Sequence, residues 1–512
     1  MARDAQETAV WRIDVADESE TIAVAHEVVA LLRRGDMVTL SGDLGAGKTT
    51  FARAVIRNLL SDPDLEAPSP TFTLMQLYEK GGLRLVHADF YRIADPSELS
   101  GLGWEEAIED SVVLLEWAER APDHLPADRL DVHLGFTDPL RPDSRSITVT
   151  GYGAFAARLA PFRALRQLLR TEGWSDARRV FLQGDASARA YETLEKANGE
   201  RAILMISPPR PDGPPVRYGK SYSAIARLAE NVRPFVAIAD GLRAFGFSAP
   251  RILGHDLDAG LLIVEDLGRE GVVDAAGPIP ERYLEAAAVL ARLHAQDLPD
   301  TLPVADAGEY RIPAYDLDAL LIEVELMLDW YVPHLRTIVS SGARATFVNL
   351  WRDALAEIVA ARATWTLRDY HSPNLLWLPE RGEIARIGII DFQDCVLGHP
   401  AYDLASLGQD ARVDVSDELE LRLLAHYARL RRADAPDFDM PAFARAYAVL
   451  AAQRATKILG IFARLNQRDG KPQYLRHLPR IEAYLRKSLR HPALADIRQW
   501  CENNIPSLLT AD

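Results

Sequence analysis

The sequence predicts two domains: an α/β domain with a parallel sheet and crossover helices over residues 1–153, and a two-lobed α+β domain over residues 154–512. In the front part strand and helix signals alternate, whereas the back part passes from short strands to a mostly helical pattern. The charge divides at the same place. The front part holds 14 basic and 27 acidic side chains (14 − 27 = −13), so only −3 of the total charge of −16 falls on the rest.

The front elements follow in the order that a parallel sheet requires. An amphipathic helix is predicted over residues 21–34 and ends at Gly35, and a strand over 37–40 leads into a glycine-rich turn and another helix. Two further apolar strands lie at 83–89 and 112–116. The polar, proline-bearing segment FTDPLRPDSRSITVTGYG predicts a hairpin-like end to the domain.

The back part opens with a helical pattern from Ala154, then short strands at 178–195 and 201–206 and a helix near 221–231. These elements and the apolar segment LLIVEDLG predict a small lobe over about 165–268. A mostly helical lobe follows over about 269–500, interrupted by two short strand pairs around 366–392.

The composition limits where and how the protein works. The chain has no run of about 20 apolar residues and no basic start followed by an apolar stretch, so we expect a soluble, cytoplasmic protein without membrane association. Cys395 and Cys501 form no CxxC pair and are expected to be reduced, buried thiols. The acidic front part would repel a phosphate backbone, which argues against direct nucleic-acid binding.

The segment SGDLGAGKTTF at 41–51 matches the P-loop pattern GxxxxGK[ST] between a strand and a helix. The glycines let backbone N–H groups surround phosphates, the lysine offers a point charge, and the first threonine hydroxyl can join a Mg²⁺ shell. The front part is therefore predicted to be a P-loop NTPase that uses ATP and Mg²⁺. Its predicted nucleotide-binding residues are Gly42, Gly45, Gly47, Lys48, Thr49 and Thr50.

A P-loop needs carboxylates at the same sheet edge to help hold the metal and orient the attacking water. Asp89 ends the strand LRLVHAD, and Glu116 ends the strand VVLLE. Between them and the P-loop, SPTFT at 69–73 is a hydroxyl-bearing loop in which Thr71 is a candidate sensor of the metal or the γ-phosphate.

Together, GDLGAGKTT, SPTFTL, HADFYR and LLEWAER resemble the TsaE family, the ATPase subunit of the bacterial machinery that makes threonylcarbamoyladenosine in tRNA. The resemblance covers nearly all of residues 10–150. It implies that Thr49 and Asp89 hold the metal, Glu116 serves the hydrolytic step and Trp117 forms a wall of the nucleotide pocket. It also implies that ATP turnover acts on a complex with TsaD-like and TsaB-like subunits.

The back part contains a second phosphate-and-metal set in TLRDYHSPNLLWL at 366–378 and IGIIDFQD at 387–394. Phosphoryl transfer to a hydroxyl requires a carboxylate near the acceptor proton and two oxygen ligands for Mg²⁺. Asp369, Asn374 five residues later, and Asp391 after an apolar strand supply that set, with the D-x-x-x-x-N spacing of kinase-like catalytic loops.

Other segments complete a kinase-like site. FLQGDASARAYETL at 181–194 suits a nucleotide loop that includes Gly184 and Arg189, and LLIVEDLG suits a hinge at Glu265 whose backbone reads adenine. Asp403, in GHPAYDLASL, is placed where it can brace the catalytic loop, and a second reading, compatible with that role, is an N-terminal helix cap.

These motifs resemble the aminoglycoside phosphotransferase-like kinases, whose fold is protein-kinase-like, over about residues 165–500. RDYHSPNLLWL, GDASARAY and VELMLDWYVP are most similar to the cell-wall amino-sugar kinases (AmgK), which phosphorylate N-acetylmuramate and N-acetylglucosamine at the anomeric hydroxyl. The resemblance implies that Asp369 is the catalytic base and that Asn374 and Asp391 are Mg²⁺ ligands. One departure is Met205, which stands where such folds usually carry a phosphate-binding lysine. The candidates to replace that lysine are Lys196, Lys220 and Arg189.

The leading hypothesis is thus a bifunctional protein that joins an ATPase for tRNA modification to a sugar kinase of peptidoglycan recycling. In one alternative, the kinase acts on another small hydroxyl compound such as an aminoglycoside, choline or homoserine. In the other, the back part is a nucleotide-binding regulator without turnover.

Overall fold

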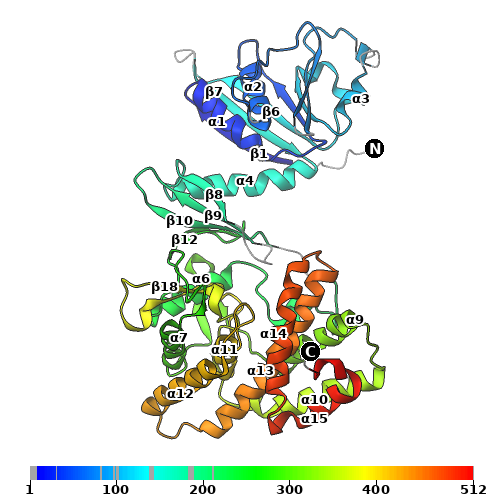
Figure 1. Cartoon of the computed structure of the whole chain (residues 1–512). Helices are drawn as coiled ribbons and strands as arrows, with labels where there is room; N and C mark the ends of the chain where they lie inside the picture. Colours follow the sequence, from blue (N-terminus) through cyan, green and yellow to red (C-terminus); the bar gives the residue numbers. More distant parts are fainter. Residues whose placement is uncertain are drawn as a thin grey trace. The chain divides into compact units, whose positions relative to one another are not determined.

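The computed structural model describes residues 8–29, 31–60, 62–80, 83–95, 98–99, 103–137, 143–182, 189–209 and 213–510 (Figure 1). The chain divides into two compact units, Met1–Thr171 and Glu172–Asp512. The sequence analysis placed the boundary at residue 153, so the two divisions differ by one helix, α4 (Ala154–Thr171). That helix belongs to the first compact unit because its Phe155 and Leu159 are buried in the core of that unit.

A seven-stranded mixed sheet forms the centre of the first unit, in the order β1-β7-β6-β2-β5-β4-β3. The four neighbouring strands β6, β2, β5 and β4 run parallel, as predicted, whereas β1, β7 and β3 add antiparallel edges. The strands are β1 (Thr8–Val15), β2 (Met37–Ser41), β3 (Met75–Lys80), β4 (Leu83–Asp89), β5 (Val112–Glu116), β6 (Arg129–Phe136) and β7 (Arg145–Tyr152). The predicted hairpin-like end corresponds to the β6–β7 pair.

Helices cover both faces of this sheet. α1 (Glu18–Val29), α2 (Lys48–Leu59) and α4 share one apolar core with inward-facing strand residues, and α3 (Trp104–Ile108) packs in a second core on the opposite face. α1 begins three residues before its predicted start. The reason is local, because the Asp17 carboxylate accepts the backbone N–H of Glu20 at 3.0 Å and so caps the helix there.

The second unit begins with a five-stranded antiparallel sheet in the order β11-β12-β10-β9-β8. Its strands are β8 (Arg178–Leu182), β9 (Ala190–Glu195), β10 (Arg201–Ile206), β11 (Ile252–Asp256) and β12 (Leu261–Glu265). α6 (Arg233–Ala244) follows α5 (Tyr222–Ala226), which is shorter than the helix predicted over 221–231. α5 stops because Arg227 takes a left-handed conformation with φ of 58°.

The rest of the second unit is mostly helical and is built around the long helix α13 (Met440–Gln467). The other helices are α7 (Pro280–Leu293), α8 (Leu317–Leu326), α9 (Val332–His334), α10 (Ser341–Ala360), α11 (Ala401–Gly408), α12 (Asp417–Asp434), α14 (Leu478–Ser488) and α15 (Ala495–Asn504). A π-helical turn, Met327–Tyr331, connects α8 to α9.

Short strand pairs complete this lobe. They are β13 (Val273–Asp274) with β14 (Gly277–Pro278), β15 (Thr301–Pro303) with β16 (Glu309–Arg311), β17 (Thr364–Thr366) with β20 (Val396–Gly398), and β18 (Leu375–Trp377) with β19 (Ile387–Ile389). The last two pairs are the ones predicted around 366–392, and they enclose the segment that carries the predicted catalytic loop.

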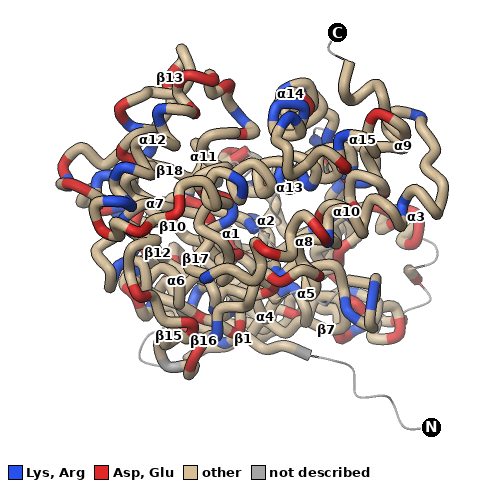
Figure 2. Tube along the Cα trace, turned by 90° about the horizontal axis from the view of Figure 1, so that it is seen from below, with Lys and Arg blue, Asp and Glu red and all other residues tan. Residues whose placement is uncertain are grey.

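The charges at the ends of α12, the two cysteines and the apolarity of the helices can be compared with what the sequence predicts. α12 has acidic residues in its first turn and arginines in its last, the order that complements the helix dipole, and Figure 2 marks these charges in red and blue. Cys395 and Cys501 are free and buried, as expected. Among the described residues, no helix is both long enough and apolar enough to cross a membrane.

The close approach of α8 and α13 generates a test of the core. A Cβ on Gly460 of α13 would lie 2.4 Å from the carbonyl carbon of Leu326, the last residue of α8. We expect Gly460→Ala to lower the free energy of unfolding of the second unit by about 1–3 kcal/mol, because backbone would have to move. Urea unfolding of the full chain measures this. The control is Gly342→Ala on α10, where the nearest atom to the new Cβ is 4.0 Å away. Equal effects of the two changes would contradict this view of the α8–α13 contact.

Candidate functional sites

The P-loop of the first unit has the backbone that its glycines permit. Gly42 has φ of +131°, and a Cβ there would lie 2.1 Å from the carbonyl oxygen of Leu134, so no other residue fits without rearrangement. Lys48 Nζ donates to the carbonyl oxygens of Gly42 at 2.7 Å and of Asp43 at 2.9 Å. It also lies 4.0 Å from the centre of the Trp117 ring. The predicted phosphate-binding lysine and pocket wall are therefore neighbours.

The rest of the loop also takes left-handed turns, with φ of 81° at Gly45 and 105° at Gly47. Arg145 Nε donates to the carbonyl oxygen of Ala46 at 3.0 Å and so holds the outside of the loop. Burial lowers the pKa of Lys48, and Glu116 is the largest of the negative charges that oppose this shift.

The two predicted carboxylates stand side by side at the end of the parallel strands, because Asp89 is the register partner of Glu116. The Thr49 hydroxyl donates to the Glu116 carboxylate, 3.1 Å from either oxygen. His87 Nε2 lies 3.0 Å from Glu116 Oε1. A hydroxyl and carboxylate oxygens are suitable Mg²⁺ ligands, so this donor set fits the metal that the sequence predicts. The contacts associate Glu116, rather than Asp89, with Thr49.

Asp89 instead holds the hydroxyl-bearing loop. Its Oδ2 accepts hydrogen bonds from the hydroxyls of Ser69 and Thr71, both at 2.6 Å, and its Oδ1 accepts the backbone N–H of Tyr91 at 2.9 Å. A loop tied to one carboxylate can respond to a metal or phosphate that changes the charge beside it. The roles of Asp89 and Thr71 stay predictions.

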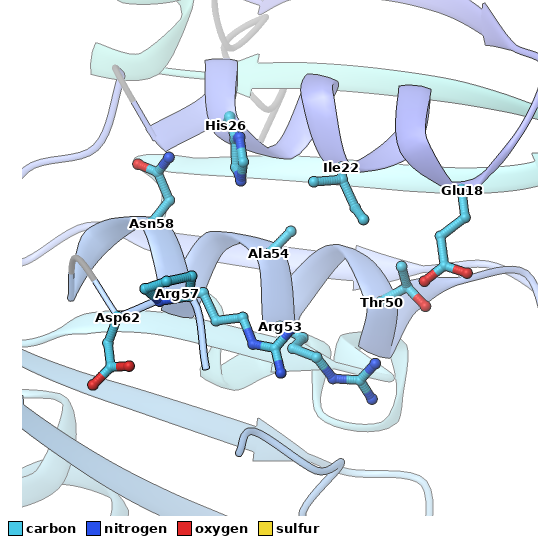
Figure 3. Close-up of a pocket in the computed structure, with 10 residues that line it drawn as sticks. Glu18, Ile22, His26, Thr50, Arg53, Ala54, Arg57, Asn58 and Asp62 are labelled. Atoms are coloured by element: carbon cyan, nitrogen blue, oxygen red, sulfur yellow. The ribbon is translucent and has the colours of Figure 1, made fainter. Parts of the chain in front are cut away.

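Thr50 lies apart from these contacts, at one end of a groove between α1 and α2 (Figure 3). The groove has a volume of about 550 Å³ and is polar along its α2 side, where Arg53, Arg57 and Asn58 line it. Glu18 and His26 contribute from α1. The groove therefore begins one residue after the metal-side threonine of the P-loop.

In the second unit, the structure brings four of the predicted site residues together. Asn374 Nδ2 donates to the carbonyl oxygen of Asp369 at 2.9 Å, and the carbonyl oxygen of Asn374 accepts the N–H of Ile390 at 3.0 Å. This second bond connects the loop to the strand that precedes Asp391. Arg189 Nη1 reaches Asp391 Oδ1 at 3.2 Å.

The surroundings shift the two carboxylates in opposite directions. Burial raises the pKa of Asp391, and the nearby Asp369 raises it further. Burial also disfavours the charged form of Asp369, but Lys457, His371 and other cations outweigh it and hold the pKa below its usual value. Asn374 and Asp391 offer oxygen donors close to a second carboxylate, a chemistry that suits Mg²⁺. Among the described residues, no group of three or more His, Cys, Asp or Glu is placed to hold a metal ion.

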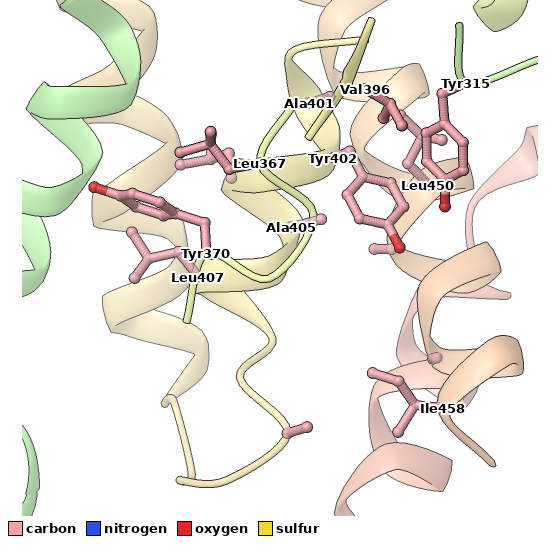
Figure 4. Packing of buried hydrophobic residues seen from close by; sticks show 14 of the residues in the cluster. Tyr315, Leu367, Tyr370, Val396, Ala401, Tyr402, Ala405, Leu407, Leu450 and Ile458 are labelled. Carbon is pink, nitrogen blue, oxygen red and sulfur yellow. The ribbon is translucent and has the colours of Figure 1, made fainter. Parts of the chain in front are cut away.

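The catalytic loop is held from below by α11. The Asp403 carboxylate accepts the backbone N–H groups of Leu367 at 2.7 Å and Arg368 at 2.8 Å, which confirms that it braces the loop. The other reading, a helix cap, is wrong because the N-cap of α11 is Pro400. Figure 4 shows Leu367 and Tyr370 packed beside α11 in the same apolar cluster.

Arg368 fixes the loop through its side chain as well. Its guanidinium pairs with Glu323 of α8 and donates to the carbonyl oxygen of Ala226 at 3.0 Å. Lys457 Nζ lies 2.8 Å from the same Glu323 carboxylate. All of these polar groups lie beneath the loop that carries Asp369.

The remaining predicted residues are placed as follows. Gly184 lies outside the described residues. Glu265 sits in the predicted hinge, but its carboxylate is bound by Arg381 Nη2 at 2.8 Å, and its N–H donates to the carbonyl oxygen of Arg251. Its role in reading adenine stays a prediction.

Met205, which stands where a phosphate-binding lysine is usual, is buried in the core. Among its candidate substitutes, Lys196 pairs with Glu200 at 3.0 Å and lies over the Trp174 ring, whereas Arg189 contacts Asp391. The contacts therefore favour Arg189 over Lys196 as the replacement cation.

Sequence reasoning missed His87, Glu323 and Lys457. A polar residue inside an apolar strand was the available signal for His87. Glu323 and Lys457 lie on helices far from the catalytic loop in sequence, and only the packing of α8 against α13 brings them to that loop.

The brace on the catalytic loop can be tested directly. In Asp403→Asn, one of the two backbone donors would face an amide N–H instead of an acceptor. We expect the free energy of unfolding to fall by about 1–3 kcal/mol, as for other buried unsatisfied groups, and the amides of Leu367 and Arg368 to lose hydrogen-exchange protection. The control is Asp353→Asn on the exposed face of α10. Unchanged protection of both amides would contradict the brace.

Comparison with known proteins assigns both units to families. The model of the family "Threonylcarbamoyl adenosine biosynthesis protein TsaE" matches residues 15–143, and that of the "Phosphotransferase enzyme family" matches residues 179–438. Both resemblances predicted from the motifs are thereby confirmed, together with the P-loop and kinase-like fold classes.

Individual relatives agree. The chain is 40% identical over 352 residues to an N-acetylmuramate/N-acetylglucosamine kinase of Caulobacter vibrioides, covering 66% of this chain and 95% of that protein. It is 30% identical to the protein of the same name from Pseudomonas aeruginosa, covering 65% of this chain and 91% of that one. Over 122 residues it is 37% identical to a tRNA threonylcarbamoyladenosine biosynthesis protein TsaE of Rickettsia felis, which corresponds to 24% of this chain and 71% of that protein. The chain therefore belongs to the phosphotransferase enzyme family through its second unit and to the TsaE family through its first.

Proposed function

We propose that the protein is bifunctional. Its first unit is an ATPase that supports threonylcarbamoyladenosine modification of tRNA, and its second unit is an ATP-dependent kinase that phosphorylates the anomeric hydroxyl of N-acetylmuramate or N-acetylglucosamine. One observation carries the kinase assignment: the second unit aligns with 95% of an amino-sugar kinase and gathers Asp369, Asn374 and Asp391 at one place. Peptidoglycan recycling is the corresponding process.

In the kinase, Asp369 is the catalytic base. Neighbouring cations keep its carboxylate ionised, so it can accept the proton of the sugar hydroxyl. The sugar oxygen attacks the γ-phosphorus of ATP, the bond from that phosphorus to the bridging oxygen breaks, and ADP leaves. When bound, Mg²⁺ neutralises charge on the phosphates. Asn374 and Asp391 are its ligands, and Arg189 supplies the cation that Met205 does not. The backbone of the hinge at Glu265 contacts adenine. The segment around Gly184 is the nucleotide loop.

In the ATPase, Lys48 and the P-loop backbone bind the phosphates, and Thr49 serves the metal. Glu116 either orients the attacking water or shares the metal with Thr49, since its oxygens already accept the Thr49 hydroxyl. The family supports a role beside TsaD-like and TsaB-like subunits. A net charge of 14 − 27 = −13 over residues 1–153 leaves tRNA contact to those subunits.

Because each unit has its own site, a substitution in one site should remove one activity and leave the other unchanged. Lys48→Ala removes the phosphate-binding charge of the first unit, so we expect loss of tRNA modification support in cells with sugar phosphorylation unchanged. Asp369→Asn removes the base of the second unit and should do the reverse. Nucleoside analysis of tRNA and a coupled kinase assay measure the two activities. Loss of both activities from either change in a folded protein would refute two independent sites.

Arg189 gives a narrower test of the kinase site. If it replaces the usual lysine, Arg189→Met should raise the KM for ATP about tenfold, as expected for loss of one charge-assisted contact to phosphate. The matched control is Lys196→Met, which removes a cation paired with Glu200 in the adjacent β9–β10 turn. If the control raised the KM as much as the Arg189 variant, the assignment would be wrong.

A further inference from the structure

A strip of three partly exposed residues runs along the middle of α13. Within residues 449–465, all of which the structure describes, every side chain is buried except those of Lys457, Ile461 and Arg464. Spacings of four and three residues place all three on one side of the helix. This side of α13 is therefore less buried than the rest of the segment, which faces the protein core.

The strip begins beside the proposed catalytic base. Lys457 Nζ lies 2.8 Å from Glu323 Oε1 and 3.5 Å from the Tyr402 hydroxyl, and Glu323 also pairs with Arg368, the residue before Asp369. After burial, Lys457 has the largest effect on the Asp369 carboxylate, and it favours the charged form. The less buried side of α13 therefore starts beside the proposed catalytic base.

Arg464 marks the other end of the strip and carries a charge without an anionic partner. Its guanidinium lies over the Tyr222 ring, 5.3 Å from the ring centre. Among the described residues, its Nε has no hydrogen-bond partner and no carboxylate approaches the guanidinium within the 4.0 Å of an ion pair. The nearby Asp469 pairs with Arg468 instead, at 2.7 Å.

An arginine in this state is adapted to an anion from outside the protein. Burial lowers the pKa of Arg464, with Tyr222 and Asp469 only partly opposing the shift. A partly buried guanidinium gains most from a carboxylate, which its planar fork binds with two parallel hydrogen bonds. The part of the chain that the structure describes supplies no such carboxylate, and an acidic substrate would.

The spacing along the helix suits one sugar. Seven residues separate Lys457 from Arg464, which corresponds to about 10 Å along α13. If the anomeric hydroxyl lies at Asp369, close to Lys457, and the ring follows this side of α13, the ring substituents extend in the direction of Arg464. N-acetylmuramate carries a lactyl ether with a carboxylate on its ring, whereas N-acetylglucosamine has a neutral hydroxyl at that position.

We propose that Arg464 binds the lactyl carboxylate of N-acetylmuramate and makes the kinase prefer this sugar to N-acetylglucosamine. This inference rests on the proposed kinase function and adds to it the residue that distinguishes the two acceptors. Lys457, occupied by Glu323, stays with the catalytic loop, and Ile461 contributes an apolar surface between the two cations.

The test is a cycle of protein and substrate changes in the full-length chain. We measure kcat/KM for N-acetylmuramate, its uncharged methyl ester and N-acetylglucosamine with the unchanged protein, Arg464→Met and Arg464→Lys. In Arg464→Met, the ratio of kcat/KM for N-acetylmuramate to that for N-acetylglucosamine should fall roughly 10- to 100-fold, as expected for one charge-assisted pair. Arg464→Lys should retain part of the ratio. The unchanged protein should lose a similar factor on the methyl ester, and Arg464→Met should not discriminate against the ester.

Arg468→Met is the matched control, since Arg468 lies one turn further along the same side and is already paired with Asp469. It should leave the ratio within about twofold of the unchanged protein. A fall of equal size for both sugars in Arg464→Met would indicate a structural role for Arg464 and overturn the inference, with the kinase function intact. Full discrimination against the methyl ester in Arg464→Met would overturn it as well. If the unchanged protein phosphorylated neither sugar, the proposed kinase function itself would fail.

Discussion

The buried carboxylate of Glu323 is the constraint on which the kinase site depends. A carboxylate without access to water needs nearly complete compensation, and two cations supply it: Arg368 from the catalytic loop and Lys457 from α13. The Tyr315 hydroxyl and Gln453 Nε2 also donate to it, at 2.5 Å and 3.1 Å. One negative and two positive charges leave a surplus of positive charge beneath the loop, which stabilises the ionised form of Asp369, the residue that follows Arg368.

This network also explains an unusual backbone. Arg368 and Asp391 both have positive φ, 67° and 60°, a conformation that costs energy for residues with a side chain. At Arg368, the backbone N–H donates to Asp403 and the side chain pairs with Glu323, whereas Gln393 and Arg189 contact the carboxylate of Asp391. The strained backbone is thus retained because each of the two residues is held by at least two contacts.

In the first unit, backbone geometry brings the buried charged residues of the site together. Parallel pairing of β4 with β5 sets Asp89 opposite Glu116, and pairing of β2 with β5 and β6 brings Gly42 against Leu134. The P-loop can form only because Gly42 has no side chain. The hydroxyl-bearing loop then docks on Asp89, so that the two carboxylates and this loop meet at one sheet edge.

Sequence alone determined the features that depend on local order. Strand and helix alternation, the P-loop, the spacing of Asp369, Asn374 and Asp391, and the change of charge near residue 153 are all written in consecutive residues. The predicted ends of helices differ from the structure where a single capping or left-handed residue sets the boundary, as at the start of α1 and the end of α5. Only the tertiary structure decided which distant side chains support these motifs: His87 lies beside Glu116, and Glu323 and Lys457 lie beneath the catalytic loop. It also leaves Arg464 without a carboxylate partner among the residues that the structure describes. These contacts join segments tens to hundreds of residues apart. The packing of α8 against α13 and of β4 against β5 creates them. Because the periodicity of one segment reports only that segment's own helix or strand, it cannot predict such contacts.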